Sequence, residues 1–320
     1  MSSYAVFNYQ FGKIIKRTDE LSLFSDEEME MGADTAFPIR QEILDRIIIQ
    51  DFQKKNSIHF HSQFSNEKVY LHRHVIPPTD GITIIRLANK RSTTIVTKEL
   101  EERTEDDYQN CIVIIDNRPG IQRILIENKK TAFNSVKQVE RILQYTLNEM
   151  LHRYSLYIDL MHLQDPRAFW SLANDKRSYP NGFYKITFHL PHLNLERLRK
   201  VFDKVLVMSR EVFDSDLEWS YKAQQGGELN LDEKNPYQQG LIEWMMKEVG
   251  DENIKLYSND DKRKAIIVGR DSFFTVGVKE STIRRLAEEA VNRELFGSPA
   301  LEEIKLKAET GIDPKTLKHE

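Results

Sequence analysis

Polar and apolar residues alternate along much of the first half of the chain. A spacing of two is typical of strands with one buried face. It predicts a strand or hairpin arm at residues 4–15 and six further strands, at 57–64, 68–76, 81–88, 92–97, 111–116 and 121–126. The Pro-Pro-Thr-Asp-Gly sequence at 77–81 predicts a tight turn between two of them. Short strands at such intervals favour one antiparallel, curled sheet.

Two segments of the same half have the spacing of helices instead. Pro38 suits the first turn of a helix that runs to about residue 54. Asn134 is a suitable N-cap for a second helix, whose apolar positions fall on one side. Those positions are Val136, Val139, Leu143, Leu147 and Met150. We expect both helices to pack on the sheet.

The second half changes between the two spacings more often. It predicts strands at 154–164, 182–190, 217–223, 254–257, 265–269 and 273–278, with helices at 194–208, 236–249 and 281–295. A polar, irregular stretch between Pro166 and Pro180 is the best candidate for a domain boundary. We therefore predict an α+β protein in three parts. These are an N-terminal domain at 1–165 with the antiparallel curled sheet, a smaller mixed α+β domain at 166–296, and a charged tail at 297–320.

Composition places the chain in an ordinary globular class. Of its 320 residues 40% are hydrophobic and the net charge is -4, so the chain is long enough to bury a core. The single cysteine, Cys111, excludes an internal disulfide and cysteine-built zinc sites, and we expect it to pack as a small hydrophobe. Without an apolar run of membrane-spanning length or a signal peptide, we expect a cytoplasmic protein with no direct membrane insertion.

One carboxylate pattern bears on enzymatic activity. Asp116 ends one predicted strand, and the sequence Glu127-Asn128-Lys129 ends the next. This order is similar to the core of the PD-(D/E)xK nucleases, in which two carboxylates hold Mg²⁺ and a lysine steadies the attacking water. Asp116, Glu127 and Lys129 are thus candidate catalytic residues, and a chance acidic hairpin tip is the alternative. Without that activity we expect no cofactor.

Four histidines lie on two neighbouring predicted strands. His59 and His61 alternate on the first strand, and His72 and His74 on the second. A turn centred between residues 66 and 67 would put His61 opposite His72 and His59 opposite His74, as a metal site or a pH sensor requires. A slip of one residue would put the two pairs on opposite faces.

Basic residues recur at strand ends, in turns and along one predicted helix. Gathered on one face, they would bind phosphates without reading sequence, even in a chain of negative net charge. An ordinary mixed surface is the alternative. The candidates for nucleic-acid binding are Arg86, Lys90, Arg91, Lys130, Arg197, Lys200, Lys204, Lys262, Arg263 and Lys264.

The order of the predicted segments resembles the RexA-like and KwaB-like phage-exclusion proteins of bacterial anti-phage defence. The segments that carry the resemblance are 68–74 (KVYLHRH), 81–87 (GITIIRL), 111–115 (CIVII), 120–128 (GIQRILIEN) and 184–190 (YKITFHL). The resemblance implies a two-domain α+β protein that binds DNA non-specifically, forms homo-oligomers and acts with a membrane-associated partner. It transfers no catalytic residues.

These observations lead to one principal hypothesis and two alternatives. The principal hypothesis is a non-enzymatic, sequence-independent nucleic-acid-binding protein of an anti-phage defence or mobile-element locus. The first alternative is a Mg²⁺-dependent nuclease of the PD-(D/E)xK type. The second is a protein–protein adaptor or a sensor of a phage component.

Overall fold

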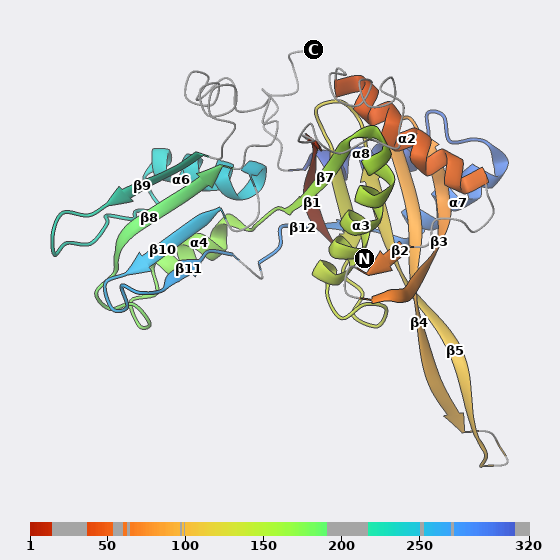
Figure 1. The fold of residues 1–320 in the computed structure, drawn as a ribbon, viewed down its shortest axis with the longest axis horizontal. Coiled ribbons are helices and arrows are strands. Elements are labelled where there is room, and N and C mark those ends of the chain that lie inside the picture. Colours follow the sequence, from red (N-terminus) through yellow and green to blue (C-terminus); the bar gives the residue numbers. More distant parts are fainter. Residues whose placement is uncertain are drawn as a thin grey trace, which may run out of the picture. The chain divides into compact units, whose positions relative to one another are not determined.

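The chain folds into two compact units with antiparallel sheets and helices, which confirms the predicted α+β class. The computed structural model describes residues 1–14, 37–53, 60–62, 65–96, 98, 100–190, 217–249, 253–269 and 272–310. The first unit comprises residues 1–160 and 275–310, and the second comprises residues 161–274. Figure 1 shows the helices and strands of each unit. No helix within the described ranges is long and apolar enough to cross a membrane.

The first unit is built on an eight-stranded sheet. Its strands are β1 (Ser2–Lys13), β2 (Phe60–Ser62), β3 (Ser65–Thr79), β4 (Ile82–Val96), β5 (Glu102–Asp116), β6 (Arg123–Glu127), β7 (Leu156–His162) and β12 (Thr275–Val278). They follow the order β12-β1-β6-β5-β4-β3-β2, and β7 also pairs with β1. The central strands are apolar and buried on both faces, because helices and other segments cover the sheet.

A tight turn joins β3 to β4, as the sequence predicts. Asp80 and Gly81 both have positive φ, at 50° and 75°. Such a pair of left-handed residues matches the twist of the strands that it connects. A Cβ atom at Gly81 would also lie 2.4 Å from the side chain of Arg118. The turn therefore depends on glycine for two separate reasons.

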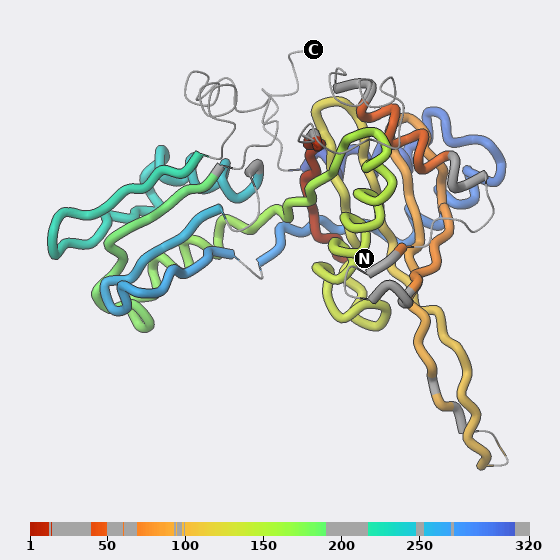
Figure 2. The backbone as a smooth tube through the Cα atoms, in the orientation of Figure 1, coloured from red at the N-terminus to blue at the C-terminus, as the bar shows by residue number. Residues whose placement is uncertain are grey.

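Strands β4 and β5 are longer than predicted. They pair over all fifteen residues of each strand, from Ile82 opposite Asp116 to Val96 opposite Glu102. The predicted strands at 81–88 and 92–97 are one strand, and the acidic residues 102–107 belong to its partner. Alternation marks a strand only where one face is buried. The distal half of this hairpin leaves the body of the unit (Figure 2), so its sequence does not alternate.

Four helices belong to the first unit within the described ranges: α2 (Phe37–Gln53), α3 (Val136–Leu151), α7 (Glu280–Asn292) and α8 (Pro299–Glu309). Helix α3 buries the apolar side that the sequence predicts, including Val139, Leu143 and Leu147. Its N-cap is Ser135, whose hydroxyl accepts a hydrogen bond from the backbone N–H of Gln138 at 3.2 Å. The predicted cap at Asn134 is wrong by one residue.

Helix α8 occupies part of the segment that the sequence predicts to be a charged tail. Ser298 caps it by accepting hydrogen bonds from the backbone N–H groups of Ala300 and Leu301, both at 3.2 Å. The helix buries Leu301, Ile304 and Ala300 despite its charged composition. Apolar residues three and four positions apart suffice to give a helix one buried face.

The buried guanidinium of Arg123 holds the end of α8 against the sheet. Its Nη1 donates hydrogen bonds to the carbonyl oxygens of Ala308 and Thr310, both at 2.7 Å. Its Nε donates to Asn8 Oδ1 on β1 at 3.1 Å. A cation at the C-terminal end of a helix is also attracted by the partial negative charge of the helix dipole there. Arg123 thus links β1, β6 and α8.

A second arginine makes a parallel connection. Arg118 pairs with Asp116 at 2.7 Å and with Glu309 of α8 at 2.8 Å, and donates to the carbonyl oxygen of Lys305 at 3.2 Å. The ammonium group of Lys305 in turn pairs with Asp80 and Glu302. Buried or half-buried ion pairs of this kind are costly to break singly, because one charge is then left without its partner.

The second unit is a four-stranded antiparallel sheet with two described helices. The strands are β8 (Phe183–Leu190), β9 (Leu217–Lys222), β10 (Ile254–Ser258) and β11 (Ala265–Ile267), in the order β11-β10-β8-β9. The helices are α4 (Pro166–Ala173) and α6 (Pro236–Trp244), and a π-helical turn, Met245–Val249, continues α6. Helix α4 lies where the sequence predicts an irregular stretch. Asp165 caps it and Pro166 opens it, which suits a helix start.

The division between the units differs from the predicted domains in the C-terminal part of the chain. The predicted boundary at residue 165 lies near the observed division at residue 160. However, residues 275–310 return to the first unit, where β12 pairs with β1. A return of the chain after a complete second unit leaves no local sign in the sequence. The predicted helix at 194–208 and the tail beyond residue 310 lie outside the described residues.

We expect replacement of Arg123 by methionine to destabilise the protein by about 3 kcal/mol, because two buried oxygen atoms and one half-buried oxygen atom lose their donor. Urea unfolding followed by circular dichroism measures the change. Arg284→Met is the control, since Arg284 makes an ion pair with Glu280 in which both side chains are 71% exposed. That loss is expected to stay below about 0.5 kcal/mol. Equal effects of the two substitutions would contradict this role of Arg123.

Candidate nucleic-acid interface

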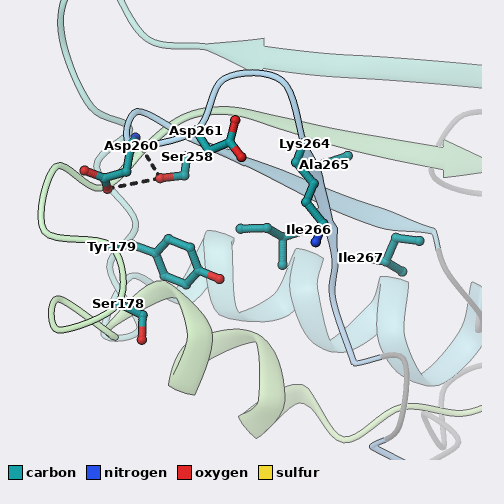
Figure 3. Close-up of a pocket in the computed structure, with 9 residues that line it drawn as sticks. All are labelled: Ser178, Tyr179, Ser258, Asp260, Asp261, Lys264, Ala265, Ile266 and Ile267. Carbon is teal, nitrogen blue, oxygen red and sulfur yellow. Dashed lines mark hydrogen bonds between the residues drawn. The ribbon is translucent and has the colours of Figure 1, made fainter.

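The four-stranded sheet of the second unit has one face packed on helices. Its core contains Phe188 and Leu256 from the sheet, Phe169 from α4, and Ile242 from α6. Figure 3 shows both helices, pale green and pale blue, on the same side of the strands. Side chains alternate between the faces of a sheet, so the neighbours of these apolar residues point to the opposite face.

Three lysines lie on that opposite face, which we call the open face. Lys185 of β8 pairs with Lys222 of β9 and, on its other side, with Tyr257 of β10. Lys255 of β10 lies two residues before Tyr257, opposite Thr187 of β8. Residues that pair directly in an antiparallel sheet share a face. The open face therefore carries cations from three adjacent strands: Lys222 is exposed and Lys185 and Lys255 are half-buried, while Thr187 on the same face is buried.

Two tyrosines accompany the lysines. The pairing of β10 with β8 shifts at Tyr257, so that Ser258 lies opposite Phe183 and Tyr184 is the extra residue of a bulge. The rings of Tyr184 and Tyr257 lie edge to face, with centroids 6.2 Å apart. The ammonium group of Lys185 lies 4.8 Å from the centre of the Tyr257 ring, within the range of a cation–π contact.

The turn between β10 and β11 extends this surface. It contains Lys262, Arg263 and Lys264, which are all exposed. The ammonium group of Lys262 lies 5.7 Å from the centre of the Tyr184 ring. Of the three residues in this turn predicted to bind nucleic acid, Lys262 thus lies beside a tyrosine of the open face, and Arg263 and Lys264 follow it in the same turn.

Acidic residues border the open face and limit its extent. Glu218 of β9 pairs with His189 at the far end of β8. Asp260 and Asp261 begin the turn after β10, and they line a pocket of about 440 Å³ together with Lys264 and Tyr179 (Figure 3). Two carboxylates in its wall disfavour a phosphate group there. We therefore do not include the pocket in the nucleic-acid interface.

Two of the four predicted basic residues of the first unit already have partners within the protein. Lys90 pairs with Asp106 at 2.7 Å, and Arg91 donates to the carbonyl oxygen of Ala132 at 3.3 Å. Arg86 is exposed and lies opposite Arg73, and Lys130 is exposed in the loop after β6. Arg197, Lys200 and Lys204 lie outside the described residues.

The sequence interpretation overlooked the residues at the centre of the open face. Lys185, Lys222 and Lys255 stand singly in three segments that are separated along the chain. A search for runs of basic residues passes over them. The available signal was the alternation itself, since in the β8 and β10 sequences a lysine or a tyrosine stands beside Phe183, Ile186, Ile254 and Leu256.

The structure does not bring the predicted nuclease residues together. Asp116 pairs with Arg123, and Glu127 lies four residues farther along β6, a separation of about 13 Å at the usual rise of a strand. Asp116 is fully buried and its carboxylate bonds to Arg118, while Glu127 accepts a hydrogen bond from the backbone N–H of Ile112 at 3.0 Å. The antiparallel pairing of β5 with β6 puts the two carboxylates at opposite ends of the ladder. Lys129 follows the Glu127 end.

The predicted pairing of the histidines is wrong. His61 pairs with Val69 instead of His72, because the β2–β3 register is shifted and a bulge follows His61. His59 lies outside the described residues. His72 and His74 remain neighbours, with ring centroids 5.7 Å apart, and Phe60 lies edge-on to His72. Within the described ranges, no three His, Cys, Asp or Glu residues gather as a metal site would require.

Cys111 is buried, as the sequence predicts, at 1% exposure. Burial raises the pKa of its thiol to about 12, and the nearby carboxylate of Glu127 adds to this effect. Only a thiolate is a strong nucleophile. Cys111 therefore serves packing in this structure.

Comparison of the sequence with models of known protein families gave no match, and comparison with curated proteins gave none either.

We expect His74 to weaken the fold in mild acid. Burial, and after it the neighbouring His72, lowers the pKa of His74 to about 4. Between about pH 6.5 and 4 the unfolded chain takes up a proton that the folded chain does not, so stability falls as the pH falls. Urea unfolding should show wild type losing about 1–2 kcal/mol more than His74→Gln between pH 7 and 5.

His152→Gln is the control for this comparison. His152 is exposed at the end of α3, so its replacement removes an exposed imidazole and leaves that of His74 in place. A wild-type stability profile that runs parallel to that of His74→Gln would contradict the assignment.

Proposed function

We propose that this protein is a non-enzymatic, sequence-independent nucleic-acid-binding protein and that the open face of the second unit is its contact surface. The observation that carries the proposal is the grouping of Lys185, Lys222 and Lys255 with Tyr184 and Tyr257 on one sheet face. Lysines attract phosphates wherever they stand in the strand sequence, and tyrosine rings stack on any base.

The geometry favours single-stranded over double-stranded nucleic acid. A sheet face with aromatic side chains offers a platform on which splayed bases stack, and duplex bases are not free to do so. Lys185 and Lys262, which lie against the two tyrosine rings, carry point charges and lack the planar fork with which arginine reads guanine. Binding without sequence preference follows from both features.

The biological setting is proposed from the sequence resemblance. We propose a cytoplasmic role in anti-phage defence or at a mobile-element locus, together with a membrane-associated partner. Such a role would use a protein that recognises single-stranded nucleic acid whatever its sequence. Neither proposed setting requires catalysis. The nuclease alternative loses support from the separation of Asp116 and Glu127, which leaves Mg²⁺ without a pair of ligands.

We expect the combined substitution of Lys185, Lys222 and Lys255 by alanine to weaken binding of single-stranded DNA and to flatten its salt dependence. Each lost phosphate contact reduces the slope of log K against log salt by about 0.7, so the triple variant should lose about 2. Fluorescence anisotropy with a labelled oligonucleotide over a salt series measures both quantities.

The matched control removes the same charge from the same unit. Lys176, Arg177 and Lys234 are exposed and lie outside the open face. Their combined replacement by alanine should leave the salt slope almost unchanged. Equal loss of affinity and slope in the two triple variants would show that general charge, and not the open face, determines binding.

Stacking on tyrosine gives a separate expectation. Tyr257→Ala should weaken binding of single-stranded DNA about tenfold, since a stacked base contributes roughly 1–3 kcal/mol. Tyr257→Phe keeps the ring and should bind almost as wild type does. Anisotropy titrations at one salt concentration compare them, and a phenylalanine variant as weak as the alanine variant would argue against stacking.

A further inference from the structure

The distal half of the β4–β5 hairpin forms a two-stranded arm, which we define as residues 90–96 and 102–108. Pairing of β4 with β3 ends at Ala88, and pairing of β5 with β6 ends at Val113. Beyond these points, no strand within the described ranges pairs with either outer edge. Figure 2 shows the arm extending away from the body of the first unit.

A two-stranded ribbon of this kind is at best marginally stable alone in water. The residues at its tip have no covered face, since those from Glu102 to Asp106 are all exposed. Each outer edge also presents backbone N–H and C=O groups that can pair with another strand. The arm therefore gains stability if a further strand joins it.

The two edges of the arm differ in charge. The β5 edge contains four acidic residues, Glu102, Glu105, Asp106 and Asp107, and one basic residue, Arg103, so its net charge is negative. Charged residues on an edge strand oppose pairing with another chain. The β4 edge has no charge from Ser92 to Val96, and its sequence Ser-Thr-Thr-Ile-Val is rich in β-branched residues that favour strands. Only the β4 edge is suited to strand addition.

We propose that the β4 edge of the arm pairs with the β4 edge of a second copy of this chain, antiparallel and centred on Thr94. Two-fold symmetry would place Thr94 opposite its own copy, with Ser92 opposite Val96 and Thr93 opposite Ile95 on either side. No charged residue opposes another across these five positions. The product is a four-stranded ribbon, β5-β4-β4-β5, with its carboxylates on the two outer edges.

The charge distribution selects a second copy as the occupant. An interface with a two-fold axis uses the same surface twice and closes after two copies. Residues 92–96 carry no charge, so two antiparallel copies of this segment can face each other without repulsion. Two copies of the acidic β5 edge would repel each other. The inference does not depend on nucleic-acid binding, because it concerns a different unit of the chain.

Disulfide formation at the axis provides the direct test. Thr94 and Thr104 pair directly across the arm, on β4 and β5, and both are exposed. Thr94→Cys would face its own copy one strand spacing away, whereas Thr104→Cys would lie three spacings from its copy, about 14 Å. A disulfide needs Cα atoms within about 7 Å. The native Cys111 is 1% exposed and does not compete.

Oxidation of the full chain should convert Thr94→Cys to a covalent dimer on a non-reducing gel while Thr104→Cys stays largely monomeric. Equal crosslinking of the two variants, or none in either, would overturn the proposal. The two variants carry the same new thiol on the same arm, so random collision affects both alike.

Sedimentation of charge variants supplies an independent measurement. Thr94→Lys puts like charges opposite each other at the axis and should weaken self-association about fivefold or more. Thr104→Lys adds the same charge on the outer edge and should leave the dimer intact. A wild-type chain that sediments as a monomer at tens of micromolar, or a dimer that persists in Thr94→Lys, would overturn the proposal.

Discussion

The alternation of side chains across the four-stranded sheet of the second unit determines the character of this protein's candidate site. Ile186 and Phe188 turn toward α4 and α6, so Lys185 and Thr187 must turn away from them. A slip of one residue between β8 and β10 would exchange the two sets and bury charge. The apolar core therefore fixes the positions of the lysines without touching them. Their grouping is a consequence of packing on the other face.

The first unit uses its charged residues in a different way. Asp116 is a candidate catalytic residue when only the sequence is considered. In the structure it pairs with Arg118, and Arg118 and Arg123 hold α8 on the sheet. Burial raises the pKa of Asp116, and the contact with Arg118 opposes that shift. The carboxylate of Asp116 thus already has its ion-pair and hydrogen-bond partner within the protein. Charge at the end of a central strand can therefore serve the fold alone.

Much of the architecture follows from local patterns in the sequence. The α+β class, the apolar side of α3 and the turn at Asp80 and Gly81 all depend on residues close together in the chain. The register of β2 with β3 does not, because an irregularity between His61 and Ser62 shifts the pairing by three residues. The same limit explains why His61 and His72 were predicted to face each other and do not, and why Asp116 and Glu127 were predicted to lie together and do not.

The candidate interface was only partly predictable for the same reason. Lys262, Arg263 and Lys264 are adjacent in sequence and form a visible basic run. Lys185, Lys222 and Lys255 come together only through the pairing of three strands that are far apart along the chain. The bulge at Tyr184 adds an aromatic residue that simple alternation would place on the opposite face. Long-range pairing, which no local pattern specifies, creates the site.

Mapping the contact with a photoreactive oligonucleotide tests the central claim most directly. Single-stranded DNA that carries 5-bromouracil is bound to the full chain, irradiated and digested, and the crosslinked peptides are identified by mass spectrometry. The account predicts crosslinks to β8 and β10, at Tyr184 and Tyr257, which are lost at high salt. Crosslinks confined to the first unit, with none on these two strands, would contradict it.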